Sequence, residues 1–342
     1  MKAFFVLYLA SFLVLIYTDP FNELDNDDTP GKIHSLYQQH YSNYKKYLKK
    51  FSKKHDPSVP EPIRLLKFVQ NVKMIDEHNR RYTEGKETYK LALNEMSDWT
   101  GEEKERLRGY VLNRTGGVEA NMSQILKQKA HKIIPDSFDY RSIIKLAPVK
   151  NQGNCGVCFI FSALGALEMY IALKNKQPAV RLSVQDIMDC SNMEKCSGRG
   201  GNAAKVFEWI AEHGVTTDQN YPYKGRDSIS CPRSMGERIK AELIGGVYLP
   251  RDNEKIIRKM LNLINFIIIF FGIYNDPSCP TEGNQMNHAI IAVGYGVENG
   301  MKYFIIRNSW GTTWGTNGYA RIRAGVFMCG IGRESTIPVF AE

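Results

Sequence analysis

The stretch Pro148–Tyr170, PVKNQGNCGVCFIFSALGALEMY, constrains this chain more than any other. A polar, glycine-containing loop leads into Cys155 and Cys158, and from Cys158 onward apolar residues recur at helical spacing. The spacing predicts a buried helix with Cys158 in its first turn. At that position the positive end of the helix dipole favours thiolate over thiol and lowers the pKa of the cysteine. Because a thiolate is the form that attacks a carbonyl carbon, Cys158 is a candidate nucleophile.

Two other interpretations of the C-x-x-C pair Cys155–Cys158 have to be weighed. Such a pair occurs in redox dithiols and as half of a zinc site, and a lone cysteine on a helix is most often a small buried hydrophobe. Zinc needs a second pair of ligands, and the sequence holds no other C-x-x-C or H-x-x-x-H cluster. A redox dithiol would follow a strand, and Pro148 in a polar loop is poor strand material. The nucleophile interpretation needs a histidine and an orienting Asn or Asp, and the chain has both.

The histidine and the asparagine lie in Asn287–Gly296, NHAIIAVGYG, and Ile305–Gly311, IIRNSWG. Together with the cysteine stretch, these segments resemble the papain-like cysteine peptidases of the cathepsin L type, whose His and Asn follow the cysteine by about 130 to 150 residues. The resemblance covers nearly the whole chain. It implies an α+β fold with a helical domain, a β-barrel-like domain and a cleft between them, preceded by a mainly helical pro-segment.

The resemblance also assigns a role to each residue of the site. Cys158 would be the nucleophile and His288 its base, with the pair resting as thiolate and imidazolium. Asn308 would hold the imidazole in its productive tautomer, and Trp310 would shield that hydrogen bond from water. Gln152 and the backbone N–H of Cys158 would form the oxyanion hole. The implied reaction is peptide-bond hydrolysis by an endopeptidase through a thioester acyl-enzyme, with no metal and no other cofactor.

Three parts are expected along the chain. Residues 1–18 hold an apolar run that is too short to span a membrane and is typical of a secretory signal peptide, cleaved near Thr18. Residues 19–132 are expected to be an inhibitory propeptide, with two helices joined by the proline-containing segment 57–62. Residues 133–342 would be the peptidase domain, cut free just before Pro135. Within it, helices are expected at 182–190 and 202–213 and strands at 288–296, 301–307 and 318–323.

Two motifs support the propeptide. The first is the family's interrupted E-R-F-N-I-N pattern, matched by Arg64, Phe68, Asn71, Ile75 and Asn79. The Glu of this pattern falls on Pro60, with Glu61 beside it, so the ion pair that this Glu would make stays open. The second is Ala92-x-Asn94-x-Met96-x-Asp98, which resembles the G-x-N-x-F-x-D motif. The chain would therefore be a zymogen inhibited by its own propeptide.

The chain has seven cysteines, and an odd number in a secretory protein leaves one thiol free. The sequence alone does not fix their pairing. The resemblance implies three disulfides: Cys155–Cys196, Cys190–Cys231 and Cys279–Cys329. The remaining thiol is then Cys158, which the helix argument had selected independently.

The resemblance further implies a substrate cleft built from a glycine wall, apolar side chains and one carboxylate: Gly198, Gly200, Gly201, Met286, Ala289, Trp310 and Glu334. The register of the glycines in Cys196–Gly201, CSGRGG, stays open. Glu334 lies five residues after Cys329 and would close the pocket for the second residue before the cut, so that the pocket takes Leu or Phe and also Arg. The alternative is a surface carboxylate paired with Arg333, which would contribute little energy.

The formal charge of +9 does not predict nucleic-acid binding, because the Lys and Arg residues are scattered except in 45–54 and no binding motif accompanies them. The expected partners are protein or peptide substrates and the chain's own propeptide, and the expected state is a monomer without a stable membrane span. Sequons at Asn113 and Asn121 agree with a secretory route to the lysosome or the cell exterior.

The chain departs from the family pattern in one region of consequence. Residues 263–272 run straight through a stretch where relatives carry a further strand and turn, so about a dozen residues appear missing. The family's Ser and Trp beside the nucleophile are also replaced, by Val157 and Phe159. These departures leave an alternative open: a catalytically inactive paralogue that acts as a binding or inhibitory protein on the same scaffold.

Overall fold

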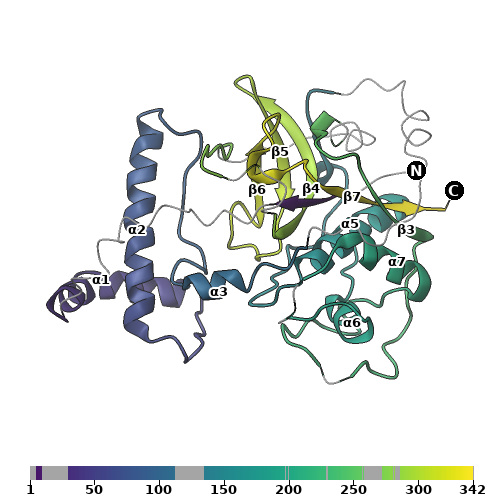
Figure 1. The fold of residues 1–342 in the computed structure, drawn as a ribbon, viewed down its shortest axis with the longest axis horizontal. Helices are drawn as coiled ribbons and strands as arrows, with labels where there is room; N and C mark the ends of the chain where they lie inside the picture. Colours follow the sequence, from purple (N-terminus) through teal and green to yellow (C-terminus); the bar gives the residue numbers. More distant parts are fainter. Residues whose placement is uncertain are drawn as a thin grey trace.

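The computed structural model describes residues 5–9, 30–111, 135–196, 198, 200–228, 230–255, 257, 272–279, 281 and 286–341. Several expectations lie outside these residues: the two sequons, the junction before Pro135 and nearly all of the short segment 263–272. The expected signal peptide also lies outside them, apart from Phe5–Leu9. Figure 1 shows the helices α1 and α2 set apart on one side of the molecule, with α3 between them and the body that carries the sheet.

The pro-segment folds around two long helices, as expected, α1 (Pro30–Lys50) and α2 (Glu61–Thr83). Proline suits the start of α2, because the first N–H groups of a helix have no intrahelical acceptor. Tyr44 and Tyr47 of α1 pack on Phe68 of α2, with ring centroids 5.3 and 5.0 Å apart. The short helix α3 (Gly101–Glu105) begins with a capping box, in which Thr100 and Glu103 satisfy each other's backbone N–H groups.

The helical half of the peptidase body contains α5 (Cys158–Asn175), α6 (Val184–Cys190) and α7 (Ala203–His213). Ser183 and Asn202 cap α6 and α7 by accepting backbone N–H groups three residues on. Among the described residues, α5 is the one helix long and apolar enough to cross a membrane, but 83% of it is buried inside the protein, so it is a core helix.

The other half is a seven-stranded antiparallel sheet, counted over the described residues. Its strands lie side by side in the order β3-β7-β1-β4-β5-β6, and β2 pairs with β4. The strands are β1 (Phe5–Leu9), β2 (Phe138–Asp139), β3 (Leu243–Tyr248), β4 (His288–Glu298), β5 (Met301–Arg307), β6 (Tyr319–Arg323) and β7 (Ser335–Phe340). Two 3-10 turns complete the elements, at Tyr140–Ser142 and Met328–Gly330. The α+β fold class and the strands expected in β4, β5 and β6 are confirmed.

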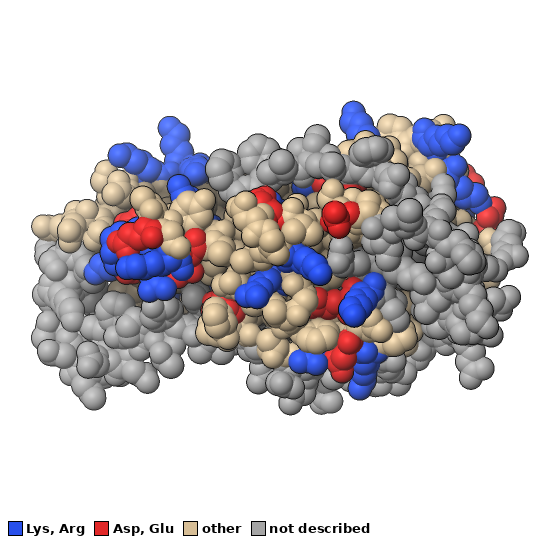
Figure 2. All heavy atoms as spheres, turned by 90° about the horizontal axis from the view of Figure 1, so that it is seen from above, with Lys and Arg blue, Asp and Glu red and all other residues tan. Residues whose placement is uncertain are grey.

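The cysteines form the disulfides Cys155–Cys196, Cys190–Cys231 and Cys279–Cys329, the same pairs that the resemblance implies. Cys158 is the free thiol and it is buried. Figure 2 shows Lys and Arg interspersed with Asp and Glu on the face that it draws, rather than gathered in a patch of one sign.

Candidate active site

Cys158 is the first residue of α5, the position that the sequence predicts for the nucleophile. Its side chain is fully buried, and its sulfur accepts the backbone N–H of Ala289 on β4 at 3.3 Å. The site therefore lies where the N-terminus of the central helix meets the first residues of β4. Helix packing against the sheet brings together two segments that lie 131 residues apart in the sequence.

His288 is oriented by Asn308 and Trp310. Its Nε2 lies 2.8 Å from Asn308 Oδ1, and the ring stacks on Trp310 with centroids 4.6 Å apart and planes inclined by 23°. Asn308 Oδ1 also accepts the backbone N–H of Ser309 at 2.8 Å, which identifies this atom as the oxygen. An accepting oxygen requires the imidazole proton on Nε2. His288 Nδ1, which has no hydrogen-bond partner among the described residues, is left as the proton acceptor.

Gln152 is held rigidly beside this group. Its backbone N–H donates to the Ser309 carbonyl at 2.8 Å, and its Oε1 accepts the Ser309 hydroxyl at 2.6 Å. Its Nε2 donates to the Cys155 carbonyl at 2.9 Å and to the Leu107 carbonyl at 3.1 Å. Because Oε1 is fixed by the hydroxyl, Nε2 must face the nucleophile loop. Leu107 belongs to the pro-segment, so a pro-segment carbonyl uses the donor that the sequence assigns to the oxyanion hole.

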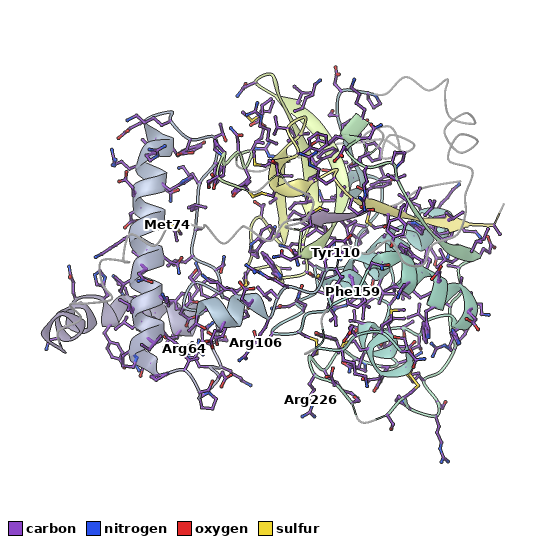
Figure 3. The ribbon with its side chains drawn as sticks, in the orientation of Figure 1. Arg64, Met74, Arg106, Tyr110, Phe159 and Arg226 are labelled. Atoms are coloured by element: carbon purple, nitrogen blue, oxygen red, sulfur yellow. A yellow bond between two sulfur atoms is a disulfide. The ribbon has the colours of Figure 1, made fainter. Side chains whose placement is uncertain are left out.

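The pro-segment crosses the site in an extended conformation after α3. Gly109 and Tyr110 both donate their backbone N–H to the Asn287 carbonyl, at 3.1 and 3.0 Å. Gly201 donates to the Gly109 carbonyl at 2.9 Å and accepts from Val111 at 3.2 Å. Figure 3 labels Tyr110 here, close to Phe159 of α5.

Gly109 makes the closest approach of this crossing strand. A Cβ on Gly109 would lie far inside 3.0 Å of the Gly156 carbonyl, a distance that real Cβ atoms essentially never show. Only glycine therefore lets the pro-segment backbone lie directly on the loop that precedes the nucleophile.

Burial under the pro-segment sets the charge state of the site. Desolvation raises the pKa of Cys158 to about 12 and lowers the pKa of His288 to about 4. Hydrogen bonds from backbone N–H groups, including those of Ala289 and Gly109, oppose the first shift but do not cancel it. In this closed zymogen form these pKa shifts favour a neutral thiol and a neutral imidazole near pH 7, and the thiolate–imidazolium pair stays a prediction for the matured enzyme. The helix dipole argument considered an exposed thiol, and the pro-segment removes that exposure.

Two buried charge clusters anchor the pro-segment. Arg64 donates to both carboxylate oxygens of Glu103 at 3.1 and 2.7 Å, and neither side chain is more than 4% exposed. Glu103 of α3 thus supplies the carboxylate that Pro60 lacks. The carboxylate of Asp98, fully buried, lies 2.8 Å from Lys53 Nζ and 2.7 Å from His55 Nε2. Both clusters lie within the pro-segment, so they stabilise the domain that presents Leu107 and Gly109.

The residues expected in the substrate cleft are only partly brought together. Gly201 contacts the crossing pro-segment backbone, and Gly200 closely approaches Gly109. The Gly198 Cα instead faces the side chain of Glu194. Met286 and Ala289 lie close to His288 in the sequence and are 5% and 1% exposed.

Glu334 does not behave as a surface carboxylate. It is 1% exposed and pairs with Arg251, whose Nε lies 3.0 Å from its Oε2. The alternative pairing with Arg333 is wrong, because Arg333 reaches Asp252 and the Thr281 carbonyl instead.

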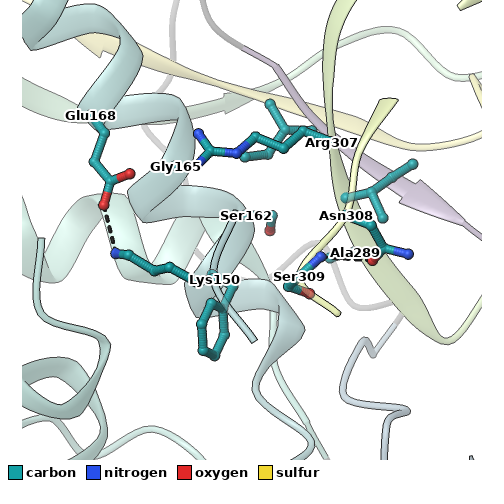
Figure 4. Close-up of a pocket in the computed structure, with 11 residues that line it drawn as sticks. Lys150, Ser162, Gly165, Glu168, Ala289, Arg307, Asn308 and Ser309 are labelled. Atoms are coloured by element: carbon teal, nitrogen blue, oxygen red, sulfur yellow. Dashed lines mark hydrogen bonds and ion pairs between the residues drawn. The ribbon is translucent and has the colours of Figure 1, made fainter. Parts of the chain in front are cut away.

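A small pocket lies between α5 and the strands β4 and β5, beside Asn308 (Figure 4). On its helical side Lys150 Nζ lies 2.6 Å from Glu168 Oε1, and burial lowers the pKa of Lys150. Asn308 and Ser309 line its opposite side. Over the described ranges, no three His, Cys, Asp or Glu side chains gather in a way that could hold a metal ion.

Sequence reasoning missed four residues that act at the site or on it: Leu107, Gly109, Ser309 and Arg251. Ser309 could have been found from its place beside Asn308 in the N-S-W-G segment. Leu107 and Gly109 follow the predicted pro-segment helices, but no sequence pattern shows which residue of the connecting segment reaches the nucleophile. Arg251 has no sequence signal.

A buried cysteine at a helix start, a histidine held by an asparagine, and a glutamine occupied by the chain's own pro-segment define a cysteine protease in its inhibited precursor form. Two family models match the chain: the papain family cysteine protease over residues 134–339 and the cathepsin propeptide inhibitor domain over residues 44–103. The chain belongs to the papain family of cysteine proteases. It is a cysteine endopeptidase that carries its own inhibitory propeptide.

Relatives and solved structures agree. The chain is 34% identical over 294 residues to a cathepsin L-like proteinase of Phaedon cochleariae, covering 82% of this chain and 88% of that protein. It is 32% identical over 321 residues to the thiol protease aleurain of Arabidopsis thaliana, covering 89% and 85%. The digestive procathepsin L2 proteinase of Tenebrio molitor superposes with a TM-score of 0.75 at 29% identity, covering 88% of this chain and 99% of that one. All three are named as proteases, so they give no support to the inactive alternative.

Proposed function

We propose that release of the pro-segment turns this chain into an endopeptidase in which Cys158, His288, Asn308 and Gln152 perform the hydrolysis. One observation supports this most strongly. The Leu107 carbonyl accepts from Gln152 Nε2 at 3.1 Å, the donor that a scissile carbonyl would need in the oxyanion hole, and the Cys158 thiol of the same site is fully buried. A pro-segment carbonyl that takes the Gln152 donor in this way keeps a substrate carbonyl out of the site.

The proposed chemistry follows from the orientation of the imidazole. With Nε2–H fixed by Asn308, Nδ1 of His288 accepts the Cys158 proton, and the sulfur attacks the carbonyl carbon of the substrate. Gln152 Nε2 donates to the oxygen that becomes negative. The C–N bond then breaks, the imidazolium gives its proton to the leaving amine, and a thioester remains. Water, deprotonated by the same Nδ1, attacks the thioester and returns the thiol and a carboxylic acid.

We propose that the substrate backbone takes the place of the pro-segment along Gly201, whose N–H and C=O both engage extended backbone in the zymogen. Gly200, Trp310, Met286 and Ala289 would line the same cleft, with Gly198 outside it.

The pocket for the second residue before the cut would end at Glu334. Because Arg251 already pairs with this buried carboxylate, the pocket favours Leu or Phe, and a substrate arginine has to compete with Arg251.

The proposed organisation is a signal peptide at 1–18, a propeptide at 19–132 and a peptidase domain at 133–342. Three disulfides suit an oxidising compartment, which supports a secretory route to the lysosome or the cell exterior. Glycans on Asn113 and Asn121 would mark that route. Protein and peptide substrates and the chain's own propeptide are the proposed partners, and the proposed active form is a monomer.

The direct test compares the matured wild-type chain with Cys158→Ala on a peptide blocked at both ends. We expect internal cleavage by the wild type and none by the variant, with all three disulfides retained in both. Equal turnover by the two proteins would contradict the assigned nucleophile. A matured wild type that neither cleaves the peptide nor reacts with a thiol-directed activity probe would establish the inactive alternative.

A further inference from the structure

Gly201 contacts the pro-segment through its backbone polar groups and the ring of Phe159 through its Cα. Its N–H donates to the Gly109 carbonyl at 2.9 Å, and its carbonyl accepts the Val111 N–H at 3.2 Å. A Cβ built on Gly201 would lie 2.7 and 2.8 Å from two atoms of the Phe159 ring, closer than real Cβ atoms come. Figure 3 labels Phe159 at the start of α5, next to Tyr110 of the crossing pro-segment. The residue that pairs with extended backbone therefore rests directly on one aromatic side chain.

The ring of Phe159, rather than the backbone conformation, is what excludes a side chain at Gly201. The φ of Gly201 lies outside the left-handed region, unlike that of the preceding Gly200 at +86°. The three atoms nearest to the built Cβ all belong to Phe159. Phe159 is fully buried, so its ring cannot turn aside without disturbing close-packed neighbours. The position of Gly201 is thus fixed by this ring.

Phe159 also lies next to the nucleophile. It follows Cys158 directly in the first turn of α5. Burial raises the pKa of Cys158, and the backbone N–H of Phe159 is among the groups that oppose this rise. The chain leading to Gly201 is tied to the same region, because Cys196 forms a disulfide with Cys155. Phe159 therefore connects the nucleophile, through its backbone, to the pairing edge at Gly201, through its ring.

We propose that Phe159 is a positioning residue of the peptidase, whose ring sets the distance between the nucleophile and the extended backbone that pairs with Gly201. This rests on the proposed function, in which substrate backbone takes the place of the pro-segment along Gly201. Phe159 stands where the family pattern has Trp, so this chain sets that distance with a smaller ring. A shift of Gly201 moves the paired backbone relative to the Cys158 sulfur, and a misplacement of about 1 Å can cost roughly 100-fold in rate.

Phe207 of α7 offers a matched control. It is also fully buried, and a Cβ on Gly246 of β3 would lie 2.8 Å from its ring. Phe159→Leu and Phe207→Leu therefore remove an aromatic ring from the same kind of contact with a glycine. Gly246 pairs with Pro338 of β7, so its displacement does not move the backbone at the site.

The first test needs no catalytic activity, because it measures amide hydrogen exchange by NMR in the full-length zymogen with Cys158→Ser. Phe159→Leu should speed exchange of the Gly201 and Val111 N–H groups by roughly 2- to 10-fold, the loss of about one hydrogen bond, and Phe207→Leu should leave both unchanged. Equal exchange at these amides in the two variants would overturn the proposal.

Gly201→Ala provides a second variant for the same measurement. Its methyl group collides with the Phe159 ring, so exchange of the Val111 N–H should again become faster. Adding Phe159→Leu makes room for the methyl group and should slow this exchange back toward the wild-type rate. A double variant that exchanges as fast as Gly201→Ala alone, or faster, would overturn the proposal.

The second test uses the matured enzyme and compares two substrates: the peptide blocked at both ends, and a single-residue ester too short to pair with Gly201. Phe159→Leu should lower kcat/KM for the peptide by roughly 10-fold more than for the ester, whereas Phe207→Leu should affect both alike. Equal losses on the two substrates in Phe159→Leu would show a merely structural role and overturn the proposal. A wild type that cleaves neither substrate would contradict the proposed function itself, whereas the exchange experiment, made in an inactive variant, decides separately whether Phe159 positions the backbone at Gly201.

Discussion

Gly109→Ala should weaken self-inhibition, because it removes the close approach of the pro-segment to the nucleophile loop. The new Cβ would collide with the Gly156 carbonyl, which is backbone and cannot turn aside. To relieve the collision, Gly109 must give up its hydrogen bonds to the Asn287 carbonyl and from the Gly201 N–H. At about 0.5–1.5 kcal/mol each, these two bonds amount to about 1–3 kcal/mol. The open form of the zymogen should therefore become roughly 5- to 150-fold more populated.

The assay is the rate at which a thiol-directed activity probe labels the unprocessed zymogen at neutral pH. Labelling of Gly109→Ala should rise by that factor over wild type. Gly101→Ala is the matched control, since a Cβ there meets nothing within 4 Å, and it should label at the wild-type rate. If Gly109→Ala labels no faster than Gly101→Ala, the crossing strand does not hold the site closed and the reasoning fails.

Three further predictions concern the anchor, the pH response and the pocket. Glu103→Gln leaves the buried charge of Arg64 uncompensated and should destabilise the pro-segment by about 3–5 kcal/mol. The thermal midpoint of the zymogen should fall accordingly, whereas Glu77→Gln, at an exposed ion pair, should leave the midpoint unchanged. Acid should open the zymogen, because the pKa of His288 is about 4 in the closed form against about 6.5 for an exposed imidazole, so the open form binds a proton first as pH falls. At pH 5 this favours opening by about 2 kcal/mol, roughly 30-fold, and probe labelling that is flat between pH 7 and 5 would contradict it. Arg251→Ala should raise the ratio of kcat/KM for Arg over Leu at the second position before the cut, and an unchanged ratio would show that the buried carboxylate does not face the substrate.

Local patterns in the sequence were enough to predict the elements that carry the site. The helix at Cys158 and the strand at His288 each have a strong periodicity or strand composition of their own. Family motifs then connected the cysteine to its histidine and asparagine, which no local rule relates. The helix caps at Ser183 and Asn202 fall where capping residues precede apolar periodic runs.

Features that depend on contacts between distant segments were not predicted. The pKa of Cys158 is raised by its burial, which the helix position of the cysteine does not reveal. Glu103 replaces a carboxylate missing at position 60, and only the packing of α3 on α2 shows that it does so.

We predict that Cys158 is a neutral thiol beneath the pro-segment and becomes a thiolate once the pro-segment leaves. The most direct measurement is the ultraviolet thiolate absorbance as a function of pH, taken as wild type minus Cys158→Ser, for the zymogen and for the matured enzyme. We predict no thiolate signal in the zymogen until well above pH 10, in line with a pKa of about 12, and a full signal in the matured enzyme near neutral pH. A zymogen that already shows the thiolate at neutral pH would contradict the account, as would a matured enzyme that shows none.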